Sequence, residues 1–378
     1  MSNKMFMRSN VYESALKRIN WLFDEFPHVY VGFSGGKDST VVLNLALQVA
    51  EERGRLPLSV VFIDQEAEWQ ATIDYMKTVM YDPRIKPFWL QVPFRIFNAT
   101  STSQDWLECW KPGDKWIRDK DPISIKENIY GTDRFSGLFG AFLKHQHPKE
   151  KAVSLGGVRC EESPARALGL TTYSTYKCET WGKKESDSRG HYAMYPIYDW
   201  ALSDVWKAIE DNQWQYCKLY DYMYKYGIKM RDMRVSNVHH ETAVRNLYFL
   251  QEIEHDTWEA ITERLSGLNT VKHLRDDFFG SKKLPTAFAN WVEYREYLLD
   301  NLITDADIKV KFRGLFDSTD RLYDGKTLQE LHQMHVQMIV VNDYHGTKLS
   351  TFVASHIGAS KNRGARSGRN LNEQFGTR

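Results

Sequence analysis

The sequence predicts an α/β protein with a doubly wound, mainly parallel sheet and a mostly helical C-terminal domain. Two observations predict the sheet: strand, glycine turn, helix and second strand follow one another within residues 29–63, and both strands are continuous apolar runs. Such runs are typical of parallel strands that helices cover on both faces. Beyond residue 215, polar turns separate segments with apolar residues at helical spacing, which predicts the second domain.

The N-terminal half predicts alternating helices and strands. In order, we expect a helix over 11–26 that Pro27 ends, a strand over 29–33, a helix ending near Gly54, a strand over 58–63, a helix over 69–80, a strand over 88–92, a strand over 152–158, a short helix over 163–170, a strand over 192–198 and a helix that Ser203-Asp204 caps and that runs to 211. Residues 95–150 lose the periodicity and are rich in Trp and charge, so we expect an insertion that could cover a site.

These patterns divide the chain into three parts. Residues 1–215 form the α/β domain with its insertion at 95–150, and residues 216–358 form the helical domain. We expect helices over 241–253, 257–265, 291–302 and 328–341 in the latter. Residues 359–378 form a basic, flexible tail with five Lys or Arg against Glu373. Such a tail could follow the phosphate backbone of a nucleic acid, and a solvated terminus explains it equally well.

Composition narrows the class of protein. Hydrophobic residues make up 42% and charged residues 26%, the mixture of a folded globular chain. Lys and Arg number 50 against 49 Asp and Glu, so overall charge favours neither a nucleic acid nor a membrane as partner. The four cysteines include no close pair, which argues against a disulfide framework or a zinc ribbon. Because the sequence contains no signal-peptide pattern and no long apolar run, we expect a cytoplasmic protein with no membrane partner.

The strongest motif lies between the first strand and the following helix. It consists of Ser34, Gly35, Gly36, Lys37, Asp38 and Ser39. The two glycines let the backbone approach a phosphate chain, and the helix start favours anions there. Lys37 adds a cation, and the two serine hydroxyls add donors. A Walker A loop would need Gly in place of Val31 and Ser or Thr in place of Asp38, so the sequence predicts a phosphate-binding loop of a different kind.

At these residues the chain resembles the PP-loop ATP pyrophosphatase superfamily, whose signature is SGG-x-DS after the first strand. The resemblance implies an adenine nucleotide alpha hydrolase-like fold. It also implies a site for the α-phosphate of ATP, at which ATP is split with Mg²⁺ into AMP and pyrophosphate to activate an acceptor as its adenylate. A glycine turn that serves only the chain path is the alternative.

Further motifs narrow the resemblance to the phosphoadenosine phosphosulfate (PAPS) reductase-like branch. These are the tripeptide 62–64, the segment 156–163 with Arg166, and the segment 195–200 followed by 204–206. They lie at the carboxyl ends of predicted strands or directly after them, where open α/β sheets bind ligands. The resemblance implies catalytic roles for Lys37, Asp38 and Arg159, nucleotide binding by Ser34, Gly35, Gly36, Lys37, Asp38, Ser39, Asp64, Gly157, Arg159, Glu162 and Arg166, and Mg²⁺ binding by Asp38 or Asp64.

Several of these residues have structural alternatives. Asp64 could cap the next helix, and Arg159 could be a surface charge. Glu162 and Arg166 have the i,i+4 spacing of a helical ion pair. The pairs His239-His240 and His332-x-x-His335 could ligate a metal, although no matching acid or cysteine accompanies them, and ordinary helix histidines explain them better.

The chain also departs from the PAPS reductases it resembles. Those enzymes end in a Glu-Cys-Gly-x-His type motif, whereas no cysteine follows Cys217 here. Sulfonucleotide reduction is therefore disfavoured and would need an external thiol or Cys160, for which buried packing is the alternative.

The resemblance is strongest to the immunoglobulin-binding regulator A type, through residues 10–13, 109–112 and 116–118. That type occurs on prophages and bacterial chromosomes beside a ParB-like partner, which implies such a partner here. Three functions remain open: an ATP pyrophosphatase or adenylyltransferase that acts on an acceptor such as a nucleic acid, a non-catalytic nucleotide-binding regulator, and a sulfonucleotide reductase.

Overall fold

The computed structural model describes residues 8–98, 105–185, 190–235, 238, 251–265 and 284–356. The chain forms two compact units, one of Met1–Arg95 with Glu108–Ser236 and one of Ile96–Leu107 with Asn237–Arg378. The first unit thus extends past the expected limit at 215. It does so because residues beyond 215 pack against the glycine loop. The Tyr220 hydroxyl accepts a hydrogen bond from the backbone N–H of Lys37, and the Val235 side chain lies against Gly36.

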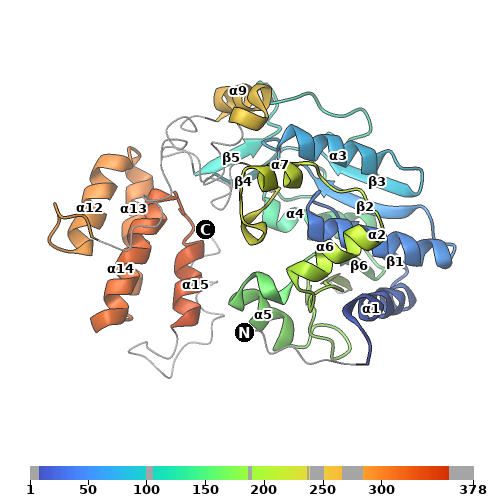
Figure 1. Ribbon diagram of the computed structural model, residues 1–378. Helices are drawn as coiled ribbons and strands as arrows, with labels where there is room; N and C mark the ends of the chain where they lie inside the picture. Colours follow the sequence, from blue (N-terminus) through green and yellow to red (C-terminus); the bar gives the residue numbers. More distant parts are fainter. Residues whose placement is uncertain are drawn as a thin grey trace. The chain divides into compact units, whose positions relative to one another are not determined.

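A six-stranded sheet forms the centre of the first unit (Figure 1). Its strands, in spatial order, are β3 (Ile85–Leu90), β2 (Leu58–Ile63), β1 (His28–Gly32), β6 (Ala152–Leu155), β8 (His191–Met194) and β7 (Gly182–Lys184). All neighbours pair in parallel except β7 and β8. The predicted doubly wound, mainly parallel sheet is confirmed. Strand order reverses between β1 and β6, and such a switch point is where open α/β sheets bind ligands.

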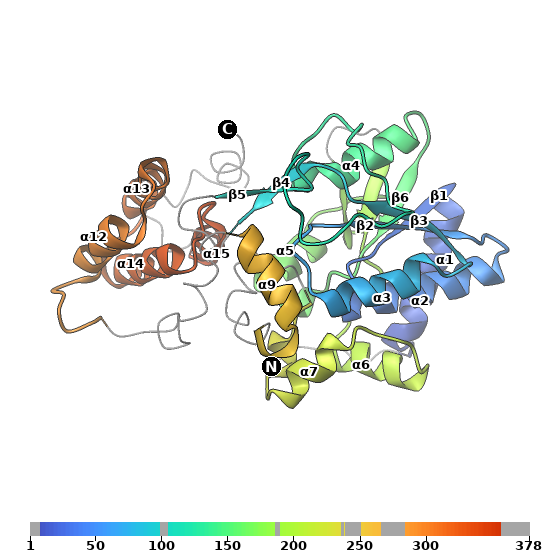
Figure 2. The same cartoon turned by 90° about the horizontal axis from the view of Figure 1, so that it is seen from above.

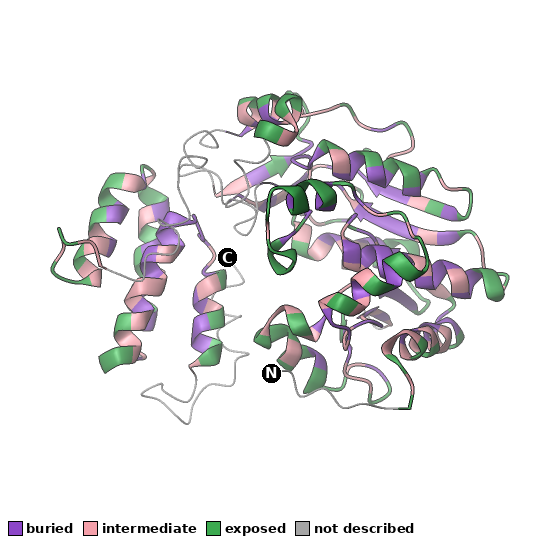
Figure 3. Cartoon of the chain, in the orientation of Figure 1, coloured by how far each residue is buried: buried purple, intermediate pink, exposed green. Residues whose placement is uncertain are grey.

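Helices cover both faces of this sheet. They are α1 (Val11–Glu25), α2 (Lys37–Glu52), α3 (Gln70–Met80), α4 (Phe135–Gln146), α5 (Pro164–Thr171), α6 (Leu202–Asp211) and α7 (Leu219–Lys225). Figure 2 shows α2 and α3 along one face and α4 on the other. Phe142 of α4 packs its ring against Tyr30 of β1 and Phe88 of β3, with centroids 5.7 and 5.2 Å apart. The inner strands β2, β1, β6 and β8 are accordingly mostly buried, whereas two of the three residues of the edge strand β7 are exposed (Figure 3).

The expected elements and the observed ones differ mainly between residues 94 and 150. That segment contains β4 (Phe94–Phe97), β5 (Trp106–Cys109) and the whole of α4, so the expectation of an insertion without helical periodicity was wrong there. Apolar residues do recur at helical spacing in α4, at Phe135, Leu138, Phe139, Phe142 and Leu143. Gly137 and Gly140 interrupt that pattern and lower its apparent helix propensity. The antiparallel strand β7 was also missed, because three residues are too few to show a pattern.

The second unit is built mainly from helices among its described residues. They are α9 (His255–Arg264), α12 (Trp291–Leu302), α13 (Ala306–Asp320), α14 (Gly325–Val340) and α15 (Thr347–Ser355). The expected segments 257–265, 291–302 and 328–341 correspond to α9, α12 and α14, whereas α13 and α15 were not expected. The expected helix over 241–253 falls mostly, and the basic tail over 359–378 entirely, outside the described residues. Within the described part of the chain, no helix combines the length and apolar character needed to span a membrane.

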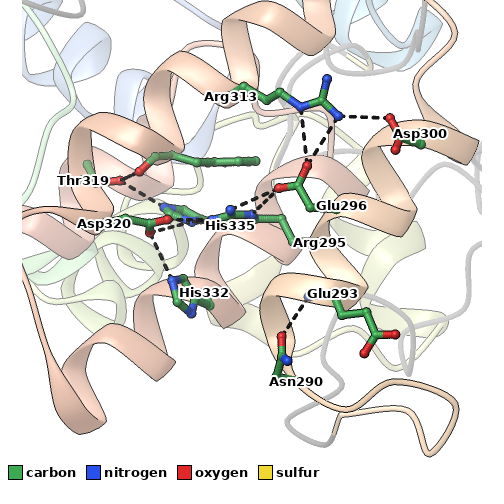
Figure 4. Close-up of polar contacts among 11 residues, drawn as sticks. Asn290, Glu293, Arg295, Glu296, Asp300, Arg313, Thr319, Asp320, His332 and His335 are labelled. Atoms are coloured by element: carbon green, nitrogen blue, oxygen red, sulfur yellow. Dashed lines mark hydrogen bonds and ion pairs between the residues drawn. The ribbon is translucent and has the colours of Figure 1, made fainter.

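A buried polar network joins α12, α13 and α14 in this unit (Figure 4). Arg295 donates from Nη1 to Oδ2 of Asp320 at 3.0 Å and to Nδ1 of His335 at 3.1 Å. His335 Nε2 lies 3.1 Å from Oγ1 of Thr319, and His332 Nε2 lies 3.1 Å from Oδ1 of Asp320. Because a guanidinium donates to Nδ1 of His335, that nitrogen has no lone pair left for a metal. Both histidines thus belong to a hydrogen-bond network between helices, in line with the alternative that they are ordinary helix histidines.

Candidate nucleotide site

The glycine loop leaves β1 at the switch point and leads into α2. Gly35 has a φ of 71°, in the left-handed region that L side chains rarely adopt. A Cβ at this position would also lie 3.0 Å from Cγ2 of Thr72. Gly36 is the N-cap of α2 and forms no side-chain cap bond. Inside the turn, Oγ of Ser34 lies 3.1 Å from Oγ of Ser39, which donates to the Gly36 carbonyl at 2.9 Å. The residues predicted for phosphate binding thus form one tight turn.

A second glycine loop follows β6 and packs against the first. A Cβ at Gly157 would lie 2.6 Å from the carbonyl carbon of Asp38 and 2.7 Å from the backbone nitrogen of Ser39. Real Cβ atoms do not approach backbone that closely. Only glycine at this position lets the loop after β6 lie directly on the first turn of α2.

An ion pair joins the two loops. Nε of Arg159 donates to Oδ1 of Asp38 at 2.6 Å, and Nη1 of Arg159 donates to Glu161 and to the Trp200 carbonyl at 3.1 and 3.3 Å. Arg159 is 4% exposed, so the alternative of a surface charge is wrong. Charge-assisted bonds of this length in a buried place hold both side chains firmly. Asp38 and Arg159, which lie 121 residues apart in the sequence, therefore act as one unit.

Lys37 is a second buried cation of the site, beside Arg159. The residue is 7% exposed, and its ammonium lies 3.6 Å from Oδ2 of Asp38 and 3.4 Å from the carbonyl oxygen of Met233. Burial lowers the pKa of Lys37, Asp38 opposes this, and Arg159 and Arg234 lower it further. A desolvated cation beside other cations gains from an anionic ligand. This electrostatic setting suits a phosphate group.

Glu162 and Arg166 form the i,i+4 ion pair that their spacing allows. Oε1 of Glu162 also accepts a bond of 3.2 Å from the backbone N–H of Arg159, which closes the turn before α5. Burial lowers the pKa of Arg166, and the charges of Arg234 and Arg159 act in the same direction. Arg166 therefore takes part both in a helical pair and in the positive field of the site.

Two residues close to the glycine loop, Tyr220 and Arg234, were not predicted from the sequence. The Tyr220 hydroxyl accepts the Lys37 backbone N–H at 3.0 Å, and its ring lies 5.3 Å from the Lys37 ammonium. Arg234 is exposed and acts on the pKa of Lys37 and of Arg166. Both lie beyond residue 215, where the α/β domain was expected to end. The only local signal is the pair of arginines Arg231 and Arg234 after a Tyr-rich helix, and it does not indicate which loop they approach.

Asp64 belongs to a separate buried cluster. Its carboxylate accepts four hydrogen bonds, from the Glu66 backbone, Trp89 Nε1, Gln91 Nε2 and Arg118 Nη2, at 2.9, 2.9, 2.9 and 2.5 Å. These four donors take up the lone-pair positions of a carboxylate. Its bonds therefore go to the end of β3 and to Arg118, not to the glycine loop. A role for Asp64 in binding nucleotide or metal stays a prediction that this hydrogen bonding does not favour.

The described residues at the loops do not present a donor set for Mg²⁺. The ion takes near-octahedral oxygen ligands, usually from one or two carboxylates together with water and phosphate oxygens. Asp38 and Glu161 each bond Arg159, and Glu162 bonds Arg166 and the Arg159 backbone. With these oxygens neutralised by guanidinium groups, the arrangement fits an anion better than a divalent cation.

The cysteine beside Arg159 is not activated. Burial raises the pKa of the Cys160 thiol, and the charge of Asp199 raises it further. A reactive cysteine needs the opposite shift, because the thiolate is the nucleophile. The arrangement therefore agrees with the expectation that sulfonucleotide reduction is disfavoured.

The phosphoadenosine phosphosulfate reductase domain family matches residues 28–226, more than half of the 378 residues. The chain belongs to this family. The matched range begins with β1, ends just after α7, and includes both glycine loops and Tyr220. The uncharacterized protein YbdN of Escherichia coli (strain K12) is 29% identical over 311 residues, which cover 78% of this chain and 75% of that protein.

Several solved structures resemble this chain at low sequence identity. Candida glabrata FMN adenylyltransferase has a TM-score of 0.38 at 16% identity, over 62% of this chain and 66% of that one, just under two thirds of its length. PAPS reductase from Candida auris, in a phosphate complex, has a TM-score of 0.36 at 15% identity, over 63% and 98% of the two chains. An NH₃-dependent NAD synthetase from Campylobacter jejuni has a TM-score of 0.30 at 11% identity, over 73% and 96%.

Proposed function

We propose that the first unit binds ATP or a related adenine nucleotide with its phosphates over the loop 34–39, and cleaves ATP at the α-phosphate. The ion pair between Asp38 and Arg159 carries the proposal, because it fixes two loops and two cations at the switch point of the sheet. Lys37, Arg166 and Arg234 add positive charge around that pair. A polyphosphate would compensate the cost of burying Lys37.

The chemistry assigned to the chain is positioning and charge stabilisation. An acceptor oxygen forms a bond to the α-phosphorus, the bond between that phosphorus and the oxygen bridging to the β-phosphorus breaks, and pyrophosphate leaves with the bonding electrons. The acceptor proton passes to solvent, and water as acceptor gives AMP and pyrophosphate. The Lys37 ammonium and the Arg159 guanidinium offset the charge that develops on pyrophosphate. Asp38 orients Arg159 through the 2.6 Å bond.

The test is release of AMP and pyrophosphate from ATP by the wild-type protein, Lys37→Ala and Lys207→Ala, with and without tRNA, duplex DNA and single-stranded DNA. Lys37→Ala should lower the rate by about 10²-fold or more, the scale measured when one transition-state donor is removed. Lys207 lies on the exposed side of α6, paired with Asp211, so Lys207→Ala should match wild type. A wild-type protein that binds ATP without cleaving it under every condition would contradict the enzyme and support the nucleotide-binding regulator.

The partners expected from the sequence remain part of this proposal. A nucleic acid as acceptor or effector would bind through the basic tail 359–378, so a chain without those residues should lose any stimulation by nucleic acid. The kinship with the immunoglobulin-binding regulator A type, its phage setting and its ParB-like partner rest on the sequence resemblance. The sulfonucleotide reductase is the least supported function, given the raised pKa of Cys160.

A further inference from the structure

Two histidines and a glutamate meet at the amino-terminal edge of the sheet in the first unit. His28 begins β1 and is the register partner of Ala152, the first residue of β6. His147 caps the C-terminus of α4, and Glu150 lies in the turn between α4 and β6. β1 runs from His28 to Gly32, and the end at Gly32 leads into the glycine loop. With a rise of about 3.3 Å per residue, the two ends of the strand lie roughly 13 Å apart. The cluster is therefore independent of the nucleotide site.

The ligand atoms of the three residues lie at coordination spacing. Nε2 of His28 is 2.8 Å and Nδ1 of His147 is 3.6 Å from Oε2 of Glu150. The three atoms all lie within 4.8 Å of one another. A tetrahedral ion with bonds of about 2.0–2.1 Å places its ligand atoms roughly 3.3 Å apart. The two distances to Glu150 lie on either side of that value, so small movements bring all three atoms onto one ion.

We propose that His28, His147 and Glu150 bind a divalent transition-metal ion, with Zn²⁺ as the best fit. Imidazole and carboxylate donors together suit Zn²⁺, whereas Mg²⁺ and Ca²⁺ prefer oxygen ligands throughout. Three protein ligands leave a fourth position for water. The stacked rings of His28 and His147, at 15° and 3.6 Å between centroids, must tilt so that both lone pairs meet the ion. His28 has 30% of its side chain exposed and Glu150 has 62%, so these two can adjust.

The surroundings of His147 support this assignment. Its Nε2 lies 2.7 Å from the hydroxyl of buried Tyr30, and its carbonyl oxygen lies 2.9 Å from Nε2 of His191. An Nε2–H that donates to Tyr30 leaves the lone pair on Nδ1, the nitrogen that faces Glu150. Metal-binding histidines commonly have their second nitrogen fixed by such a hydrogen bond. Tyr30 is thus a positioning residue, and the bound ion would tie the end of α4 to the start of β1.

The experiment is titration of the chelator-treated full chain with Zn²⁺ by calorimetry, and with Co²⁺ by visible absorption. We expect one equivalent of Zn²⁺ to bind, and a tetrahedral Co²⁺ spectrum. His147→Ala and Glu150→Gln should each weaken binding by more than about 100-fold, and Tyr30→Phe by about 10-fold, the range found when residues that support metal ligands are changed. Because Glu150 is exposed, Glu150→Gln tests the site without a risk to folding.

Two control variants define what would overturn the site. His255 and Glu259 form an exposed i,i+4 pair without a third ligand among the described residues, so His255→Ala should leave Zn²⁺ binding unchanged. Lys37→Ala should also leave it unchanged, whatever its effect on ATP. Absence of saturable binding by the wild type, or saturable binding that survives both His147→Ala and Glu150→Gln, would overturn the proposal.

Discussion

Two buried carboxyl groups in the first unit, Asp64 and Glu68, differ in their hydrogen-bond partners and in the charges around them. Asp64 is fully buried but accepts four hydrogen bonds, whereas Glu68, 5% exposed, lies in the field of the Asp64 charge. Burial raises the pKa of Glu68 well above its ordinary value of 4.5, Asp64 raises it further, and Arg118 opposes both. The buried acids near the end of β2 thus combine one carboxylate that protein donors satisfy with one whose raised pKa favours the protonated form.

This raised pKa makes a prediction for Glu68→Gln. The unfolded chain releases the Glu68 proton near pH 4.5, while the folded chain retains it to higher pH. Folding then takes up a proton in that window, so the free energy of unfolding falls as pH rises from 4.5 to the folded-state pKa. Glu68→Gln removes this loss and should be more stable than wild type at about pH 8, with a difference that shrinks toward about pH 5.

Urea unfolding of both proteins at several pH values measures the effect. Glu210→Gln on the exposed side of α6 is the control, and it should keep the wild-type slope of stability against pH. If Glu68→Gln is less stable than wild type by the same amount at every pH, Glu68 is ionised and paired in the folded state, contrary to the prediction.

At the scale of elements, the site depends on how closely two loops approach the start of α2. The position of the glycine loop could be predicted from the sequence because the loop lies between a strand and a helix that are adjacent in the chain. The second loop, after β6, lies on α2 only because Gly157 lacks a side chain. Arg159 follows two residues later and so reaches Asp38. One small residue therefore sets the distance between the two charges that carry the proposed function.

We predict that Gly157→Ala disrupts the site, whereas Gly169→Ala does not. A methyl group at Gly157 would lie 2.6 Å from backbone, so the loop must move, at a cost of about 1–3 kcal/mol, typical of overpacking. Gly169 lies within α5 with no atom within 4 Å of its Cβ position, and Ala there should add up to about 1 kcal/mol through helix propensity. Thermal unfolding and ATP binding measure both effects. Unchanged ATP binding and stability in Gly157→Ala would contradict the close approach of the loops.

At the scale of the whole molecule, the chain crosses between its two units more than once. Residues Ile96–Leu107 belong with the helices of the second unit. There the Phe97 ring lies 4.4 Å and the Trp106 ring 4.8 Å from that of His345, and Lys311 pairs with Asp105. A single cut after residue 236 would therefore leave this segment without its packing partners. Each unit has its own core, and each should respond to pH through its own buried groups.

The second unit should lose stability on acidification because of His335. Burial lowers its pKa to about 3, Asp320 opposes this, and Arg295 and His332 lower it further. The unfolded chain binds a proton near pH 6.5 and the folded chain does so only near pH 3. The free energy of unfolding therefore falls as pH drops through this window, by up to about 1.4 kcal/mol per pH unit. Hydrogen exchange of α14, corrected for the intrinsic rate, should rise between about pH 6.5 and pH 5 relative to that of β1. Equal changes in both elements would contradict a separate response of the second unit.

The sequence by itself determined the fold class, the unit of β1, glycine loop, α2 and β2, and the family motifs. These depend on neighbours along the chain: apolar periodicity, continuous strands and the φ that Gly35 must adopt. Only the tertiary structure decided that Tyr220 and the Met233 carbonyl, 183 and 196 residues from Lys37, meet that lysine, and that Asp64 turns to Trp89 and Arg118 instead. Such contacts follow from the packing of distant segments, which local patterns do not encode. The same holds for His28, His147 and Glu150, which lie at the start of β1, at the end of α4 and in the turn before β6.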